Sequence, residues 1–232
     1  MTAALPPLRP GVQPPPLSPG YGSTRLRAPS RPPVPIAPGR AELEGPALGA
    51  AFVGPKDGDL TNQLGKPVMG ERIVVAGRLL DEGGRPVPGV LVELWQANAA
   101  GRYPHPNDQH DAPLADDFTG KGRAATDADG WYRFVTVRPG AYPWRNHANA
   151  WRPSHLHFSY FGPCFASRLV TQMYFPGDPL LPFDPIYNSV PDRAARERMV
   201  AQFDFELTKP EWALGYRFDV VLRGRQATPM EA

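Results

Sequence analysis

The 232-residue chain has very little cysteine, with Cys164 as the single example. One cysteine cannot form an internal disulfide, so nothing in the sequence calls for an oxidising compartment. The sequence also has no apolar run long enough to cross a membrane, and its N-terminus has no apolar segment of the kind found in secretory signals. We therefore expect a cytoplasmic protein without a membrane partner.

An excess of charge of either sign is also missing. The 25 lysines and arginines nearly balance the 23 aspartates and glutamates, which leaves a formal net charge of +2. Nucleic acids attract strongly basic surfaces, so we expect no nucleic-acid partner. Hydrophobic residues make up 41% of the chain, which is enough for a sizeable core.

Proline, in contrast, is abundant, and 12 of the 31 prolines lie in the first 40 residues. Such a segment favours an extended chain with few hydrogen bonds. Composition slightly favours a disordered tail, but an arm that packs on a partner subunit stays open, because a proline-rich chain loses little entropy on docking. We expect a proline-rich arm over residues 1–50 and one domain over 51–232.

Short runs rich in Val, Tyr, Phe and Leu begin near residue 70 and are bounded by Gly, Pro or Asp. This pattern predicts an all-β fold, an antiparallel β-sandwich with long loops. The predicted strands are 71–80, 90–98, 131–137, 154–161, 168–175 and 216–224. One short helix is predicted near the C-terminus, over 191–204, where a proline and an aspartate precede residues that favour helix.

The segment 97–130 is long and has little strand character, because Asp, Gly, Pro and Asn dominate it. A loop of this length in a compact domain is unusual unless it is functional. It contains Tyr103, His105 and His110.

The motif "SHLHFSYF" puts His155 and His157 two positions apart in a predicted strand. Residues at that spacing share one face, about 6–7 Å apart, so both imidazoles can converge on a metal ion. Two hydrogen-bonded histidines without a metal remain an alternative. Zinc would need a further cysteine, histidine or carboxylate, and an Fe(II) facial triad would need His-x-Asp or His-x-Glu, neither of which the motif supplies.

Tyr103 and Tyr142 are further candidates, because a trivalent ion strongly lowers the pKa of a bound oxygen from the reference value of about 10 for tyrosine. Spacing alone does not separate this role from ordinary packing with the hydroxyl turned to water.

Two stretches carry a family resemblance: "VELWQANAAGRYPHPNDQHDAPLADDFTGKGRAATDADGWYRF", residues 92–134, and "RPGAYPWRNHANAWRPSHLHFS", residues 138–159. They resemble the intradiol ring-cleavage dioxygenases and, more narrowly, the iron-binding β subunits of protocatechuate 3,4-dioxygenases. The likeness runs from about residue 70 to 225 and is densest between 91 and 175. The arm matches only loosely, around "LSPGYGSTRLRAPS".

The resemblance implies one Fe(III) per subunit, with Tyr103, Tyr142, His155 and His157 as its ligands. Tyr142 would leave the iron when substrate binds, and Tyr103 would stay. Arg152 and Gln172 match residues beside the substrate, Trp144 and Ile186 match residues that wall its ring, and Tyr21 matches a substrate contact. Core packing remains an alternative for Trp144 and Ile186. His105, His110 and His147 match no ligand and are interpreted as surface or loop histidines.

The activity implied by the resemblance is cleavage of protocatechuate by O2 to 3-carboxy-cis,cis-muconate, a step of aromatic catabolism in the β-ketoadipate pathway. The proline-rich arm favours this branch, because the catechol 1,2-dioxygenases carry a helical N-terminal region instead. A homologous α subunit is then the expected partner and would supply part of the active-site wall. Intradiol cleavage of catechol, hydroxyquinol or another substituted catechol stays open, as does a non-catalytic β-sandwich binding module.

Overall fold

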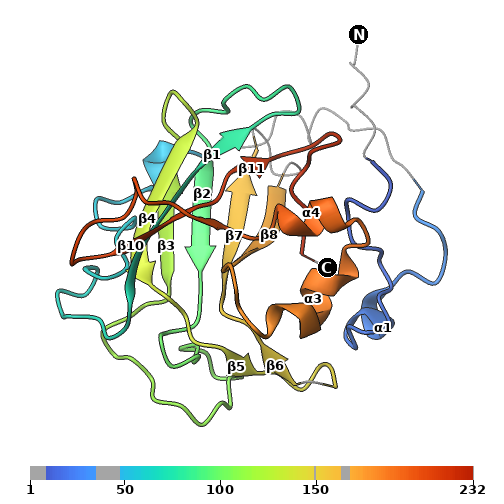
Figure 1. The fold of residues 1–232 in the computed structure, drawn as a ribbon, viewed down its shortest axis with the longest axis horizontal. Helices are drawn as coiled ribbons and strands as arrows, with labels where there is room; N and C mark the ends of the chain where they lie inside the picture. The colour runs from blue at the N-terminus through green and yellow to red at the C-terminus, as the bar shows by residue number, and fades with distance from the viewer. Residues whose placement is uncertain (1–8, 35–47, 149, 163–167, 232) are drawn as a thin grey trace.

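The computed structural model describes residues 9–34, 48–148, 150–162 and 168–231, which form a sandwich of two β-sheets with long loops (Figure 1). The first sheet contains β1 (Arg72–Leu80), β4 (Trp131–Val137), β9 (Gln202–Phe203), β10 (Leu214–Arg217) and β11 (Val220–Val221). The second contains β2 (Leu91–Trp95), β3 (Lys121–Ala125), β7 (His155–Phe161) and β8 (Arg168–Tyr174), in the order β3-β2-β7-β8. The predicted all-β sandwich is confirmed.

The main hydrophobic core lies between the two sheets and explains which face of β7 carries chemistry. Successive side chains of a strand point to opposite faces. Leu156 and Phe158 of β7 are fully buried in this core. His155 and His157 alternate with them and therefore lie on the outer face of the second sheet. The register of the sheet puts Trp95 of β2 and Gln172 of β8 directly opposite His157, on its two sides.

Strand pairing departs from the prediction in the first sheet. The second sheet is antiparallel throughout. In the first, β1 is antiparallel to β4 but parallel to β10 and β11. The chain reaches β10 only after β7, β8 and two helices, and such a long crossover lets a strand enter parallel to its neighbour.

The C-terminal third has two short α-helices where the sequence predicted one. They are α3 (Pro185–Ser189) and α4 (Arg193–Glu197), and a 3-10 turn, η2 (Leu181–Phe183), precedes them. The predicted helix over 191–204 begins correctly, because the carboxylate of Asp192 accepts a hydrogen bond from the backbone N–H of Ala195 at 2.9 Å. It is shorter than predicted, since the backbone N–H of Ala201 already donates to the carbonyl of Tyr174.

Four further strands were not predicted, and one of them, β9, lies inside the predicted helix 191–204. β3 lies within the segment 97–130, where no strand was expected, because its sequence KGRAA lacks β-branched and aromatic residues. β5 (Tyr142–Pro143) and β6 (Trp151–Arg152) are too short to leave a pattern, and they pair with each other. The loop proper therefore covers residues 96–120.

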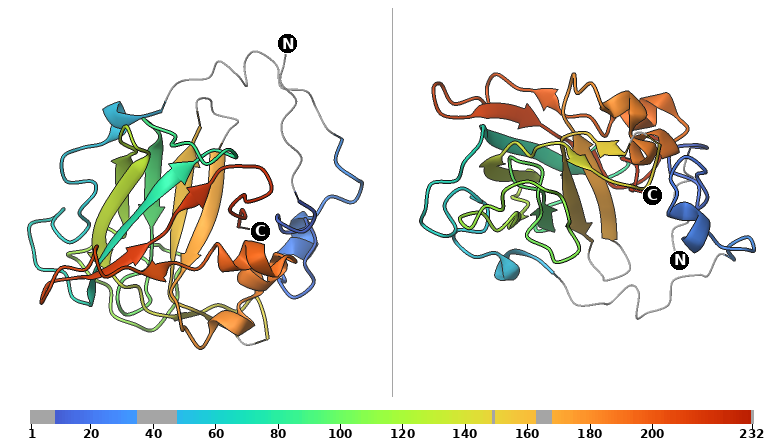
Figure 2. Two further views of the ribbon diagram at one scale, coloured as in Figure 1. Left: turned by 45° about the horizontal axis from the view of Figure 1, so that its top comes forward. Right: turned by 90° about the horizontal axis from the view of Figure 1, so that it is seen from below.

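The described part of the N-terminal arm packs against its own chain. It contains α1 (Thr24–Arg27) and runs beside α3 and α4 in both views (Figures 1 and 2). Val12 is fully buried in a second hydrophobic cluster with Tyr174, Val190 and Met199. The 3-10 turn η1 (Ala50–Phe52) then leads into the domain. Residues 1–8 and 35–47 of the predicted arm, and Cys164, lie outside the described residues. Within the described ranges, no helix combines the length and apolar character needed to span a bilayer.

Candidate metal centre and catalytic site

Four side chains predicted as metal ligands meet on the outer face of the second sheet. β7 supplies His155 and His157, β5 supplies Tyr142, and the loop between β2 and β3 supplies Tyr103. The ring centroids of Tyr103 and Tyr142 lie 5.5 Å apart, those of Tyr142 and His155 also 5.5 Å, and those of the two histidines 4.9 Å. Residues up to 54 positions apart, from 103 to 157, thus form one cluster.

Tyr103 is held by the loop that carries it, and its hydroxyl group is unsatisfied. The backbone N–H of Tyr103 donates to the carboxylate of Asp108 at 2.7 Å, and the side-chain oxygen of Asn98 accepts from the N–H of Arg102 at 2.9 Å. The Tyr103 hydroxyl is buried and has no hydrogen-bond partner among the described residues. A buried hydroxyl without a partner is costly, so this atom is suited to binding a ligand.

Both histidines use Nδ1 for a hydrogen bond to an oxygen. Nδ1 of His155 lies 2.7 Å from the carbonyl oxygen of Pro153, and Nδ1 of His157 lies 3.0 Å from the carboxylate of Glu231. An acceptor at Nδ1 fixes the proton there and leaves the lone pair on Nε2, as in metal-binding histidines. Nε2 of His155 lies 3.4 Å from the hydroxyl oxygen of Tyr142.

The electrostatics of the cluster favour a strongly positive ion. Burial, then the charges of Arg152 and His157, lowers the pKa of His155 well below its usual value, so this imidazole is neutral and able to bind a metal. Burial, then Tyr142, raises the pKa of Tyr103 well above its usual value. Its hydroxyl therefore ionises only beside a strong positive charge, which a trivalent metal supplies. The donor set fits the iron that the resemblance implies.

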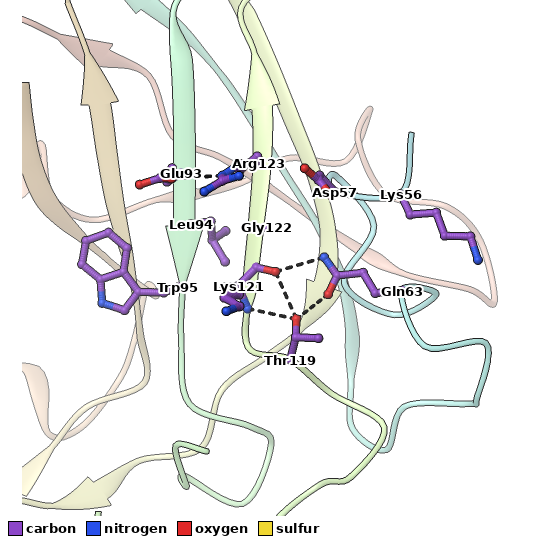
Figure 3. Close-up of a pocket in the computed structure, with 10 residues that line it drawn as sticks. All are labelled: Lys56, Asp57, Gln63, Glu93, Leu94, Trp95, Thr119, Lys121, Gly122 and Arg123. Carbon is purple, nitrogen blue, oxygen red and sulfur yellow. Dashed lines mark hydrogen bonds and ion pairs between the residues drawn. The ribbon is translucent and has the colours of Figure 1, made fainter. Parts of the chain in front are cut away.

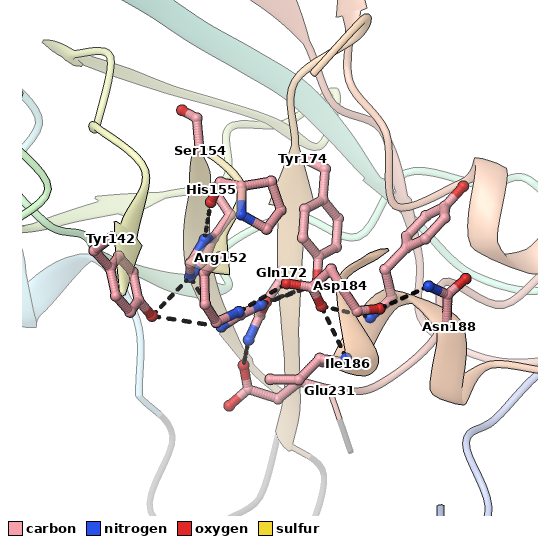
Figure 4. A network of polar contacts seen from close by, with 12 residues as sticks. Tyr142, Arg152, Ser154, His155, Gln172, Tyr174, Asp184, Ile186, Asn188 and Glu231 are labelled. Carbon is pink, nitrogen blue, oxygen red and sulfur yellow. Dashed lines mark hydrogen bonds and ion pairs between the residues drawn. The ribbon is translucent and has the colours of Figure 1, made fainter. Parts of the chain in front are cut away.

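Arg152 is the buried cation of the site. It lies on β6 directly opposite Tyr142 of β5, and its side chain is 2% exposed. Nη1 lies 3.2 Å from Nε2 of His155 and 3.5 Å from the Tyr142 hydroxyl, while Nη2 donates to the side-chain oxygen of Gln172 at 2.5 Å (Figure 4). Arg152 therefore does not form a salt bridge at the protein surface. It contacts two of the four predicted ligands.

Asp184 holds Arg152 in place. One oxygen of its fully buried carboxylate accepts from Nε of Arg152 at 2.8 Å. The other accepts from the backbone N–H of Ile186 at 2.8 Å and so caps α3 (Figure 4). Burial alone would lower the pKa of Arg152, but Tyr174 and Asp184 outweigh it and raise that pKa, so the guanidinium stays charged. One carboxylate thus joins Arg152 to the helix that carries Ile186.

The two predicted aromatic contacts, Trp144 and Tyr21, lie against this network. Cζ of Arg152 is 5.3 Å from the ring centroid of Trp144, and the Tyr21 ring meets Trp144 edge-on at 5.3 Å. Arg27 of the arm lies 4.9 Å from the ring centroid of Tyr21. The arm therefore reaches the surroundings of the predicted substrate pocket.

The other three histidines lie outside the ligand cluster. His105 is exposed, and the ring of His110 packs edge-on against Trp151 at 6.2 Å. His147 lies on a loop as expected but is not freely exposed, because its ring packs 6.0 Å from that of Trp144 and its Nε2 is buried.

Sequence reasoning missed four residues of the site. Trp95 stacks on His157 with ring centroids 4.9 Å apart and an interplanar angle of 8°. The Tyr174 hydroxyl donates to the side-chain oxygen of Gln172 at 2.8 Å. The sequence could have indicated Tyr174, because it lies two residues after Gln172 in the same strand. Asp184 precedes a proline, which is a recognisable helix-cap signal. Glu231 had no local signal.

A pocket of about 520 Å³ lies on β2 and β3, beside this site (Figure 3). Its lining is mixed: Leu94 and Trp95 are apolar, whereas Arg123 pairs with Glu93 at 3.0 Å. The amide of Gln63 donates to the carbonyl of Lys121 at 3.0 Å. Trp95 lines this pocket and also stacks on His157, so it is the link between the pocket and the candidate metal centre.

Two family models match the chain. The model described as Dioxygenase covers residues 43–224, and the model described as Protocatechuate 3,4-dioxygenase beta subunit N terminal covers residues 7–39. The protocatechuate 3,4-dioxygenase beta chain of Burkholderia cepacia is 59% identical over 216 residues, which are 92% of this chain and 91% of that protein. The protocatechuate 3,4-dioxygenase alpha chain of Pseudomonas putida is 30% identical over 79% of this chain and 88% of its own length.

Among solved structures, the dioxygenase domain of a dioxygenase carbohydrate-binding protein fusion from Streptomyces sp. SirexAA-E is similar with a TM-score of 0.51. It is 25% identical and covers 77% of this chain and 97% of its own.

Proposed function

From the premise that this chain belongs to the intradiol ring-cleavage dioxygenases, on the protocatechuate 3,4-dioxygenase β-subunit branch, we propose that it cleaves protocatechuate with O2 to 3-carboxy-cis,cis-muconate. The observation that carries the proposal is the meeting of two tyrosines, two histidines and a buried arginine at one point of the outer sheet face. A binding module would have no need of this combination.

The family uses non-haem iron, and we assign one Fe(III) per subunit to Tyr103, Tyr142, His155 and His157. When bound, the iron would supply Lewis acidity toward the two catechol oxygens and couple the substrate to O2. The orphaned hydroxyl of Tyr103 and the Nε2 of His155, which faces Tyr142 because Nδ1 is bound to the carbonyl of Pro153, support this ligand set.

Tyr142 and Tyr103 have different roles in the proposal. Tyr142 lies on the two-residue strand β5, and its hydroxyl oxygen accepts a hydrogen bond from Nη1 of Arg152 at 3.5 Å. It is suited to take a proton from a catechol hydroxyl at Oη and to turn aside. Tyr103 is suited to stay, because its hydroxyl is buried and its backbone is tied to Asp108.

Arg152 would stabilise the negative charge that develops on the substrate ring. A permanently charged, preorganised donor in a buried site lowers the energy of such charge at little reorganisation cost. Gln172 and Asp184 hold the guanidinium by hydrogen bonds at 2.5 and 2.8 Å, which supports a fixed orientation.

The arm favours an acidic substrate over plain catechol. Arg27 lies over the ring of Tyr21, which packs on the pocket residue Trp144. Because Arg27 is exposed, its charge is available to a carboxylate at the edge of the pocket. We further propose a homologous alpha chain as partner, completing the site wall, in a cytoplasmic hetero-oligomer. The beta-chain and alpha-chain relatives support this assembly.

The substrate assignment is tested by oxygen uptake with protocatechuate, catechol and hydroxyquinol, using the chain alone and with a co-expressed alpha-type partner. We expect turnover of protocatechuate to exceed that of the other two and to require or increase with the partner. Preferential turnover of catechol would contradict the assignment, and absence of iron from the purified protein would remove its basis.

The ligand roles are tested by substituting each tyrosine. We expect Tyr103→Phe to lose most of the bound iron and the visible tyrosinate-to-iron absorption. Tyr142→Phe should keep the iron and slow substrate binding and product release. Tyr216→Phe, in the first sheet, is the matched control and should behave as wild type. Normal iron content and turnover in Tyr103→Phe would exclude that residue as a ligand.

A further inference from the structure

The C-terminal segment 228–231 runs along the outer edge of β8 and ties the two sheets together. Toward the first sheet, the backbone N–H of Thr228 donates to the carbonyl of Val221 at 2.8 Å. Toward the second, Thr171 of β8 donates its hydroxyl to the carbonyl of Pro229 at 2.6 Å, and the N–H of Glu231 donates to the carbonyl of Val170 at 3.0 Å. The segment is therefore held at both ends.

The N-terminal arm contacts this C-terminal segment. The backbone N–H of Met230 donates to the side-chain oxygen of Gln13 at 2.7 Å. Val12 and Ala227 are both fully buried in the second hydrophobic cluster. The position of Glu231 is thus set by β8, β11 and the arm together.

The carboxylate of Glu231 receives two hydrogen bonds at one oxygen, Oε2. Nδ1 of His157 lies 3.0 Å from it. The side-chain amide of Gln172 donates to it at 2.9 Å (Figure 4). One carboxylate oxygen of Glu231 is therefore an acceptor that both side chains share.

We propose that Glu231 is a positioning residue that orients His157 and Gln172 together. An acceptor at Nδ1 holds the His157 proton there and turns Nε2 toward the proposed iron. Trp95 stacks on the His157 ring and fixes the plane of that ring. The Glu231 carboxylate therefore needs only to fix which ring nitrogen points toward the proposed iron. The inference rests on the proposed iron site and extends it to the C-terminal segment.

The effect reaches Arg152 through Gln172. With its amide nitrogen bound to Glu231, Gln172 must turn its oxygen toward Nη2 of Arg152 at 2.5 Å. A flipped amide would bring two donors together, which is unfavourable. Glu231 thereby orders one predicted iron ligand and the catalytic cation at once.

The two histidines are held in different ways. The acceptor for His155 is the carbonyl of Pro153, two residues away in the backbone, whereas the acceptor for His157 lies 74 residues away. Iron binding through His157 therefore depends on the docking of a distant segment, and iron binding through His155 does not.

The test compares Glu231→Ala, which removes the acceptor, with Glu231→Gln, which keeps an oxygen acceptor. The exposed Glu206→Ala is the matched control. Iron release from the loaded protein to a strong chelator is measured together with the visible spectrum. We expect release about 10–100-fold faster in Glu231→Ala with a shifted absorption band, within about 3-fold of wild type in Glu231→Gln, and unchanged in the control.

Release from Glu231→Ala at the wild-type rate, or from Glu231→Gln as fast as from Glu231→Ala, overturns the positioning role. Nitrogen-15 NMR of the wild-type iron-free chain gives a second measure that needs no variant. The His157 proton is expected on Nδ1, and a proton on Nε2 overturns the inference. Wild-type protein that binds no iron would instead refute the proposed function itself.

Discussion

At the residue scale, Arg152 shows how one side chain serves several neighbours. Its three guanidinium nitrogens contact a carboxylate, an amide, two phenols and an imidazole within 3.5 Å, and an indole faces it. A charge this deeply buried is tolerated because Asp184 neutralises it and the hydrogen bonds satisfy its donors. The planar, forked shape of the group is needed for these contacts, and not only its charge.

Arg152→Lys keeps the charge but cannot bridge Asp184 and Gln172 while facing the proposed iron ligands. We expect kcat to fall about 10²–10³-fold, the usual effect of losing one preorganised donor, with iron content nearly unchanged. Steady-state kinetics and metal analysis check this. Arg193→Lys, at an exposed ion pair on α4, is the control and should leave kcat unaltered. Wild-type kcat in Arg152→Lys would show that a point charge is sufficient.

Site residues could be predicted from the sequence where they lie close together in one motif. His155, His157 and Arg152 lie within a short motif, so their types and spacing were readable. Trp95 and Glu231 reach His157 through strand register and through a segment 74 residues away. No sequence window holds such a contact, so only the folded chain reveals these two.

At the element scale, β1 is the strand on which the first sheet depends. It pairs with β4 on one side and with β10 and then β11 on the other. Between β10 and β11 the chain approaches β1 at Phe218. The backbone N–H of Phe218 donates to the carbonyl of Ala76 in β1 at 2.9 Å. The Phe218 carbonyl then lies over Gly77, where a Cβ atom would overlap it.

Gly77→Ala is therefore expected to lower the free energy of unfolding by about 3 kcal/mol, since the backbone of a central strand must shift. Urea unfolding followed by tryptophan fluorescence measures the loss. Gly20→Ala is the control, because a Cβ there meets no atom within 4 Å, and it should change stability by less than about 0.5 kcal/mol. Equal stability of the two variants would argue against close packing at Gly77.

The elements that were predictable are those with a repeating side-chain pattern. β4 matched its predicted bounds, 131–137, because aromatic and β-branched residues fill it. β3 was missed because it is recruited by pairing with β2, not by its own residues. α4 ended early because the backbone after it joins β8, a tertiary contact that outweighs helix propensity.

At the scale of the whole molecule, the proposed metal site would link metal binding to folding. The buried Tyr103 hydroxyl has no partner among the described residues, and His155 is buried as a neutral base. A ligand that binds only the folded state stabilises it by mass action, about 4 kcal/mol when free iron is a thousand times its Kd. The sandwich has a hydrophobic core that contains none of the four proposed ligands, so we expect it to fold without the metal.

Iron removal should therefore lower the melting temperature by about 8–16 °C without changing the β-sheet content, because 1 kcal/mol corresponds to about 2–4 °C for a chain of this size. Differential scanning calorimetry of loaded and stripped protein checks this, with recovery on adding iron back as the control. Identical melting temperatures would mean that the folded and unfolded chains bind iron equally.

The sandwich was predictable as a whole, since six strand-like segments with frequent turns accommodate few other folds. The parallel entry of β10 and β11 was not, because the direction of a strand depends on the path between the sheets. The placement of the arm against α3 and α4 likewise depends on surfaces that exist only after folding.

The alternation along β7 divides that strand into two sets of residues with opposite requirements. Leu156, Phe158 and Tyr160 need hydrocarbon around them, whereas His155 and His157 need oxygen and charge. One inserted or deleted residue inside the strand would exchange the two sets. The imidazoles would then face the hydrophobic core, and the aromatic rings would face the outer side of the sheet. The length of β7 is therefore as strict a requirement for this enzyme as the identity of any ligand.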